Sequence, residues 1–233
     1  MRAYRGCMTD HTFTRRSTLA RFGGLVAAAA GGRALLTDDA AGGNLAVESG
    51  AVSCVLTPEL TEGPYYIAGG KLRRDIREGH PGTLLSLRLR VLNASTCKPI
   101  KGAAVDVWHA DAAGNYSGFG GAGSRTFLRG IQKTDATGLA VFTTVYPGWY
   151  PGRTVHIHVK VHVGGSVVHT GQLFFPDSLT DTVYEASPYA GRGTRQVRNA
   201  NDSIFVNGGK RGLLALKKNG AGYVGSISMG VHK

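Results

Sequence analysis

Two histidines separated by a single residue, His156 and His158, are the side chains best placed in this 233-residue sequence to share a metal ion. They lie in an apolar run, residues 155–161, and a β-strand turns alternate side chains to opposite faces. Both imidazoles would therefore project from the same face of a strand. A half-buried strand with a histidine-rich polar face would show the same pattern, so the interpretation depends on the neighbouring residues.

Phenols and a guanidinium surround this pair in the sequence. Residues 146–153 read Tyr-Pro-Gly-Trp-Tyr-Pro-Gly-Arg and place Tyr146, Tyr150 and Arg153 just before the histidines. Further upstream, a strand-like run leads into a tight turn that presents Tyr116. Imidazole combined with phenolate suits a hard, Lewis-acidic transition metal such as ferric iron. The residue types therefore favour a Lewis-acidic metal centre.

Four ordered motifs resemble the intradiol ring-cleavage dioxygenases, the non-haem ferric enzymes that include protocatechuate and catechol dioxygenases. They are V-W-x-A-x-x-x-G-x-Y at residues 107–116, P-G-x-Y-P at 147–151, R-x-x-H-x-H at 153–158, and a glutamine before an aromatic strand end at 172–175. The resemblance covers roughly residues 54–178. It is nearest to exported, single-chain members that begin with a T-P-x-x-T-E-G-P-Y-Y arm, here residues 57–66.

The resemblance implies a ligand set and an activity. Tyr150 is implied rather than Tyr146, because the family places its ligand inside P-G-x-Y-P. The implied reaction inserts O2 into a catechol and cleaves the ring between the two hydroxyl-bearing carbons, giving a cis,cis-muconate-type diacid. Tyr150 is implied to yield its place to the catechol and to take up a proton. The implied ligands of Fe(III) are Tyr116, Tyr150, His156 and His158.

Two further residues receive implied roles in catalysis. Arg153 matches a family arginine that stabilises charge growing on the substrate, and Gln172 matches a glutamine close to that arginine. Only five residues separate Tyr150 from His156, fewer than in the familiar protocatechuate and catechol enzymes. We therefore expect a more open site, able to take substituted catechols or hydroxyquinol.

The strand register of Gln172 decides whether it can reach this site. With a two-residue turn at Gly164-Gly165, Gln172 would pair with Ile157 and point away from the histidines. A three-residue turn or a β-bulge would pair it with His158 or His156 instead. We expect the second arrangement.

Two other classes of protein stay open at this point. A secreted β-sandwich module that binds carbohydrate or lignin surfaces without catalysis would account for the charge and the fold. A cupin-like or copper site on His156 and His158 would normally need a third histidine or a carboxylate. The colour of pure protein separates these classes, because ferric tyrosinate is red-brown and an apo or zinc protein is colourless.

From residue 50 onward the chain reads as short β runs separated by Gly, Pro, Asn and Asp, typical of an all-β, antiparallel β-sandwich with long loops and little helix. Residues 135–138, Asp-Ala-Thr-Gly, predict a hairpin turn. One short helix is expected near residues 180–186. The expected strands are residues 85–92, 103–110, 131–134, 139–145, 155–163, 167–175, 203–206, 213–217 and 223–229.

Residues 1–43 predict a twin-arginine export segment and linker, and residues 44–233 the dioxygenase-like domain. Arg15 and Arg16 precede a Gly/Ala-rich stretch that is too short and weakly apolar for stable membrane insertion. We therefore expect a secreted or cell-envelope protein. Twin-arginine export carries folded proteins, which fits iron inserted in the cytoplasm. Cys54 and Cys97 remain after this segment and predict a disulfide, with two buried free thiols as the alternative.

The formal net charge of +12 does not by itself identify a partner. Aromatic-basic interleaving and a recognition helix are missing, so we expect no nucleic-acid partner. Attraction to acidic phenolic or polysaccharide material is compatible with the charge. The expected partners are a small catechol and O2, with a homo-oligomer possible.

Overall fold

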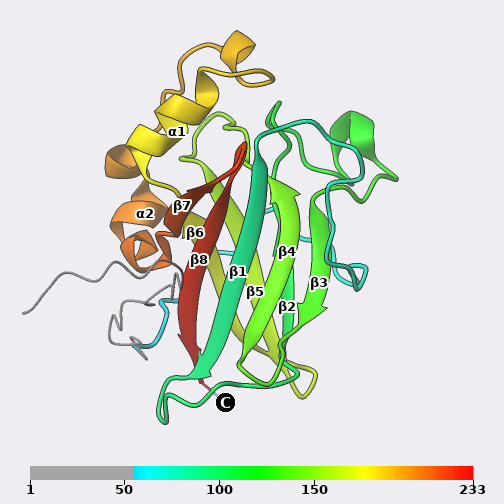
Figure 1. Ribbon diagram of the computed structural model, residues 1–233, viewed down its shortest axis with the longest axis vertical. Coiled ribbons are helices and arrows are strands. Elements are labelled where there is room, and N and C mark those ends of the chain that lie inside the picture. The colour runs from blue at the N-terminus through cyan, green and yellow to red at the C-terminus, as the bar shows by residue number, and fades with distance from the viewer. Residues whose placement is uncertain (1–54, 233) are drawn as a thin grey trace, which may run out of the picture. The chain divides into compact units, whose positions relative to one another are not determined.

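The computed structural model describes residues 55–232, which belong to the second of two compact units, Val47–Lys233. Their strands form two four-stranded sheets, ordered β4-β1-β8-β7 and β3-β2-β5-β6 (Figure 1). The strands are β1 (Leu84–Asn93), β2 (Ala104–Trp108), β3 (Arg129–Lys133), β4 (Leu139–Val145), β5 (His156–Val163), β6 (Ser166–Phe174), β7 (Ala215–Asn219) and β8 (Gly222–Val231). The helices are α1 (Asp177–Tyr184) and α2 (Ser203–Val206), with short 3-10 turns at Gly120–Ala122, Ala190–Arg192, Asn199–Asn201 and Gly209–Gly212.

The expected all-β sandwich is confirmed, with one pairing that differs from the rest. All pairings are antiparallel except β1 with β8, which runs parallel through pairs such as Leu87 with Gly225. Parallel neighbours need a long connection rather than a hairpin. Here the connection from β1 to β8 is residues 94–221, which include six strands and both helices (Figure 1).

The sandwich core comes from the alternating pattern of the strands. Leu85, Leu87, Leu89 and Val91 of β1 are fully buried and share one hydrophobic cluster with Ile157 and Val159 of β5. These side chains lie on the inner faces of the two sheets. The face of β5 that carries His156 and His158 must therefore be the outer one.

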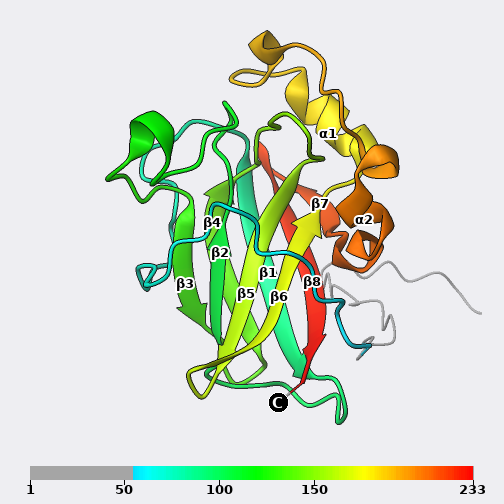
Figure 2. The ribbon, with the colours of Figure 1, turned by 180° about the vertical axis from the view of Figure 1, so that it is seen from behind.

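That outer face is covered by the chain that precedes β1. Leu60 N donates to Thr170 O at 2.9 Å, and Arg73 N donates to Ile131 O at 3.0 Å. This arm, residues 57–76, crosses the sheet β3-β2-β5-β6 (Figure 2). Because of this cover, β5 is buried on both faces, which is unusual for an antiparallel sheet. The buried outer face is where polar chemistry can occur out of solvent.

A bulge in β6 sets the register of Gln172. The Gly164-Gly165 turn pairs Val163 with Ser166, and an extra residue, Val168, then interrupts the ladder. Beyond the bulge, Gln172 pairs with His158. The expected register is confirmed, so Gln172 shares the outer face with the histidines.

The strand expected at residues 203–206 is wrong, because these residues form α2. The Asp202 carboxylate accepts hydrogen bonds from Ile204 N and Phe205 N, each at 2.9 Å. This is an N-cap, which satisfies amides that a helix start would otherwise leave unpaired. Local capping outweighs the β propensity of Ile, Phe and Val here.

Other local predictions agree with the structure within a few residues. Residues 135–138 form the expected hairpin turn, in which Asp135 Oδ1 accepts from Thr137 N at 2.8 Å and Gly138 has φ 75°. The expected helix begins earlier, at Asp177, and ends at Tyr184. Within residues 55–232, no helix has the length and apolar character needed to cross a membrane.

The predicted export segment and Cys54 lie outside the described residues. Cys97 lies in the turn after β1 and takes part in a disulfide. Its pairing with Cys54 therefore stays a prediction, as does the boundary between residues 43 and 44.

Candidate active site

The two histidines converge on the outer face of β5. Their Nε2 atoms lie 3.1 Å apart, and the His156 Nδ1 atom lies 2.7 Å from the Thr154 carbonyl oxygen. A carbonyl oxygen can only accept, so Nδ1 donates and Nε2 of the neutral ring carries a lone pair. Burial, aided by the Arg153 charge, lowers the pKa of His156 to about 3, and burial with the His156 charge moves the pKa of His158 well below its ordinary value. Both imidazoles are therefore neutral near pH 7, and each can offer a nitrogen lone pair to a metal ion.

Tyr150 and Tyr116 bring two phenols to the same point. The Tyr150 hydroxyl lies 3.1 Å from His156 Nε2, and the Tyr116 and Tyr150 rings meet edge to face with centroids 5.6 Å apart. Tyr116 is 4% exposed, and its hydroxyl has no hydrogen-bond partner within residues 55–232. Without a bound cation, burial raises the pKa of both phenols above its ordinary value. A buried phenol without a partner is costly unless something else satisfies it.

This donor set fits a cation that converts phenols to phenolates. Two neutral imidazoles and two phenols meet, and the second nitrogen of His156 is held by a carbonyl, as is typical of metal-bound histidine. A trivalent cation would reverse the unfavourable ionisation of the phenols. Among the described residues, no group of three or more His, Cys, Asp or Glu could hold a metal. The donors that meet at this point are therefore two imidazoles and two phenols.

Arg153 points its guanidinium at this centre and is held from two sides. Its Nε donates to Asp202 Oδ2 at 2.8 Å, and its Nη2 donates to Gln172 Oε1 at 2.6 Å. Its Nη1 atom lies 3.5 Å from His156 Nε2. Gln172 is fixed in turn, because its Nε2 donates to the Thr61 carbonyl of the arm at 2.9 Å. The guanidinium is therefore oriented before any substrate binds.

Tyr146 does not reach this centre. It is fully buried in the sandwich core, its hydroxyl lies 2.7 Å from Thr180 Oγ1, and its ring packs on Phe175. His109 is likewise occupied, with Nε2 2.7 Å from Thr144 Oγ1. The structure thus places Tyr150, and not Tyr146, beside the histidines.

Sequence reasoning missed several residues that shape the site. Asp202 anchors Arg153 while it caps α2, and Trp108 stacks on His158 with ring centroids 5.0 Å apart. Tyr65 of the arm stacks on Tyr116 at 4.3 Å. The Thr-Glu-Gly-Pro-Tyr-Tyr run had signalled the arm, but only the fold shows that its first tyrosine covers the phenols. The sequence Asn-Asp-Ser before an apolar run could have signalled the Asp202 cap.

Arg129 is a further residue that the sequence did not single out. Its Nε and Nη2 atoms donate to the Ser117 carbonyl at 3.1 and 2.7 Å, and its Cζ lies 6.0 Å from the Tyr116 ring centroid. The residue before it, Leu128, is buried with a positive φ of 54°, a conformation that costs energy for a non-glycine residue. Arg129 therefore fixes the turn that carries Tyr116 and places a buried positive charge beside that phenol.

Comparisons with known proteins agree on one family. A family model described as Dioxygenase matches residues 61–190. An intradiol ring-cleavage dioxygenase from Tetranychus urticae superposes with a TM-score of 0.74 at 37% identity, covering 77% of this chain and 95% of that one. The dioxygenase domain of a dioxygenase–carbohydrate-binding fusion from Streptomyces sp. SirexAA-E superposes with a TM-score of 0.61 at 31% identity, covering 76% and 98%.

A curated relative shares a shorter region. Catechol 1,2-dioxygenase 2 of Acinetobacter lwoffii is 38% identical over 102 residues, which is 40% of this chain and 35% of that protein. The match thus spans about a third of the curated relative's length.

Proposed function

Because this chain belongs to the intradiol ring-cleavage dioxygenase family, we propose that it is a non-haem Fe(III) enzyme that inserts O2 into catechol-type diols. The product is a cis,cis-muconate-type diacid. The convergence of the Tyr150 hydroxyl and the His158 Nε2 atom on His156 Nε2, each at 3.1 Å from it, carries this proposal. Tyr116 completes the set with a buried hydroxyl that has no partner within residues 55–232.

The residues that would hold Fe(III) are Tyr116, Tyr150, His156 and His158. When bound, ferric iron supplies a Lewis acid and an electron sink that make a catechol ring carbon reactive toward O2. A β-sandwich module that only binds a surface offers no reason for two neutral imidazoles and two phenols to meet under a protein cover. The buried donor set therefore favours catalysis over simple binding.

Tyr150 is the proposed proton acceptor. It is more exposed than Tyr116, and its hydroxyl lies beside His156 Nε2. As a phenolate its oxygen could take up one of the two protons of an arriving diol. Tyr116 is buried under Tyr65 and remains in place.

Arg153 is the proposed stabiliser of the negative charge that grows on the substrate. Asp202 and Gln172 hold its guanidinium, so little reorganisation is needed when that charge develops. Gln172 acts through Arg153 and is a positioning residue. The arm covers this face of the sheet, and the reduced contact with solvent strengthens each of these electrostatic interactions.

The test is the colour, iron content and O2 chemistry of the purified protein. We expect a red-brown protein with one iron per chain that consumes O2 and forms a diacid from catechol. His156→Ala should lose both iron and colour, because it removes the atom at which the donors meet. A colourless protein that binds no iron and leaves catechol intact would support the binding-module alternative.

We also propose export by the twin-arginine route, supported by Arg15, Arg16 and the Gly/Ala-rich stretch after them. Replacing both arginines by lysine should retain the protein in the cytoplasm, measured by fractionation of expressing cells. Equal export of the double-lysine variant would contradict this proposal.

A further inference from the structure

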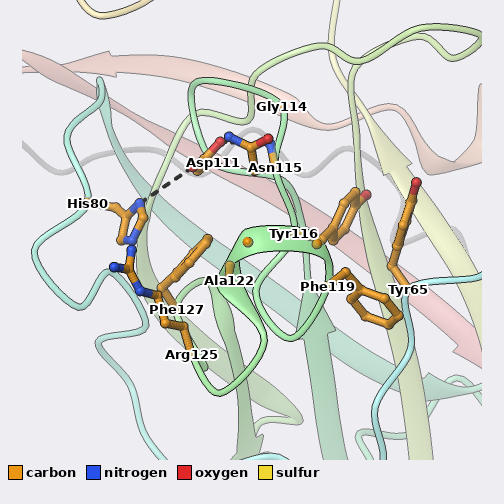
Figure 3. Close-up of a pocket in the computed structure, with 12 residues that line it drawn as sticks. Tyr65, His80, Asp111, Gly114, Asn115, Tyr116, Phe119, Ala122, Arg125 and Phe127 are labelled. Atoms are coloured by element: carbon orange, nitrogen blue, oxygen red, sulfur yellow. Dashed lines mark hydrogen bonds and ion pairs between the residues drawn. The ribbon is translucent and has the colours of Figure 1, made fainter.

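A cavity of about 460 Å³ opens beside Tyr116 and Tyr65, two aromatic residues of the candidate active site. Its volume is within the range of small-molecule sites. Figure 3 shows its two sides, with Tyr65, Tyr116 and Phe119 on one and His80, Phe127 and Arg125 on the other. One end is therefore aromatic and adjoins the phenol centre, and the opposite end carries basic groups.

The wall of this cavity is held in place at its base. Ser117 Oγ donates to the Phe127 carbonyl at 2.6 Å, and Arg129 donates to the Ser117 carbonyl. Phe127 also stacks on His80 with ring centroids 3.7 Å apart. These contacts close the loop that contains Phe119 and Arg125 into a defined shape. The cavity is thus built into the fold before any ligand arrives.

Arg125 is a cationic side chain of the cavity that has no carboxylate partner within residues 55–232. The cavity is also lined by a carboxylate, Asp111, and an imidazole, His80. These two groups face each other, with Asp111 Oδ2 3.7 Å from His80 Nδ1. Asp111 Oδ1 is also occupied, because it accepts from Ala113 N at 2.9 Å and Asn115 N at 2.8 Å. The Arg125 side chain is exposed and has no hydrogen bond or ion pair with any residue in 55–232.

We propose that this cavity is a subsite for the tail of an extended catechol whose side chain ends in a carboxylate, with Arg125 as the group that pairs with that carboxylate. The inference rests on the proposed function, since the diol end must reach the phenol centre. The aromatic wall suits a flat, conjugated tail, and the free guanidinium suits its anionic end. A bare catechol would leave this cavity to water.

The test compares three diols with the iron-loaded, full-length protein. They are caffeate, its neutral methyl ester, and catechol as the reference. Arg125→Gln should lower the ratio of kcat/KM for caffeate to kcat/KM for the ester about three- to fivefold, the size expected for a partly exposed ion pair. Arg88→Gln is the matched control, because Arg88 is an exposed arginine on the outer face of the other sheet. It should leave the ratio unchanged.

Charge reversal provides a second variant with a positive readout. Arg125→Glu should lower the preference for caffeate further and raise the preference for dopamine, a catechol with a cationic tail, relative to catechol. A ratio of caffeate to ester that is the same in wild type, Arg125→Gln and Arg125→Glu would overturn the subsite while leaving ring cleavage intact.

Calorimetric titrations with caffeate and with its methyl ester test the Arg125 subsite separately from the proposed dioxygenase function. If no diol is cleaved but caffeate binds more tightly than the ester in an Arg125-dependent way, the subsite holds and the proposed function fails. If caffeate and ester bind wild type and Arg125→Gln with the same affinity ratio, the subsite is rejected whether or not the protein is an enzyme.

Discussion

Arg153 shows at the scale of a single residue how position determines a role. Its guanidinium is fixed by Asp202 and Gln172 and aimed at the histidine pair, but it is not a proposed ligand. Arg153→Ala should therefore retain iron and colour and lower turnover by roughly 30- to 1000-fold, from the ~2–4 kcal/mol that a preorganised donor supplies to a transition state. Steady-state kinetics and the visible spectrum of the catechol complex measure the two effects separately.

The conservative variant sharpens this prediction. Arg153→Lys should recover little, because a point charge cannot bond Asp202 and Gln172 at the same time as a planar guanidinium does. Turnover of Arg153→Ala at the parental rate would mean that the residue only braces the loop.

Tyr150 and Tyr146 form a natural matched pair for mutation. Both belong to Tyr-Pro-Gly sequences, but only Tyr150 lies beside His156. Tyr150→Phe should weaken or shift the charge-transfer band and severely reduce turnover. Tyr146→Phe should leave the spectrum near normal and cost about 1 kcal/mol of unfolding free energy through its lost hydrogen bond to Thr180. The reverse pattern in iron-loaded protein would assign the ligand to Tyr146.

At the scale of an element, β2 carries a buried carboxyl under the arm. Asp106 is 3% exposed, its Oδ2 has no hydrogen-bond partner within the described residues, and burial raises its pKa to about 7 against the opposing effects of Tyr66 and Arg129. The folded-state pKa thus exceeds that of the unfolded chain, so the fold favours the protonated form. The stability that this proton contributes is complete below about pH 4 and is lost as the pH rises through about 7.

Asp106→Asn should remove this dependence, because an amide stays neutral. Between about pH 5 and about pH 8, the unfolding free energy of the wild type should fall relative to that of Asp106→Asn. Urea unfolding across that range measures the difference. Parallel curves for the two proteins would show that Asp106 does not titrate in this window.

At the scale of the whole molecule, the site is assembled from distant parts of the chain. The Arg153 guanidinium donates to Asp202 before α2 and to Gln172 in β6. Gln172 donates in turn to the Thr61 carbonyl in the arm. The arm can hold Gln172 only if it stays on the sheet. A covalent tie between the arm and the turn after β1 would help to keep it there.

We therefore expect Cys97 and Cys54 to be bonded in the exported protein. Closing a loop of about 40 residues should contribute about 3–4 kcal/mol on loop-entropy grounds. Thiol titration of the denatured, unreduced mature protein should detect no free thiol. Two free thiols would reject the pairing, and a Cys54→Ser variant with unchanged unfolding free energy would show that the bond contributes nothing.

Much of this molecule follows from local pattern. Alternation within residues 155–161 predicts a strand that turns His156 and His158 to one face, and the Asp-Ala-Thr-Gly turn predicts its hairpin. Both features depend on neighbours in the sequence, so a correct prediction needs no knowledge of the rest of the fold. The single wrong element, residues 203–206, also has a local cause, because the Asp202 cap competes with a β-prone run.

Tertiary structure decided what lies around those residues. Only the fold brings Asp202 to Arg153 and places Arg129 beside Tyr116, whereas the choice of Tyr150 over Tyr146 already followed from the family motif P-G-x-Y-P. The sequence allowed two registers for Gln172, which place its side chain on opposite faces of the sheet, and the bulge at Val168 selects the one that pairs it with His158. The physical reason is the same throughout: alternation determines which way a side chain points relative to its own strand. The partner it meets depends on chain reversals and crossovers many residues away, where one inserted residue reverses the outcome.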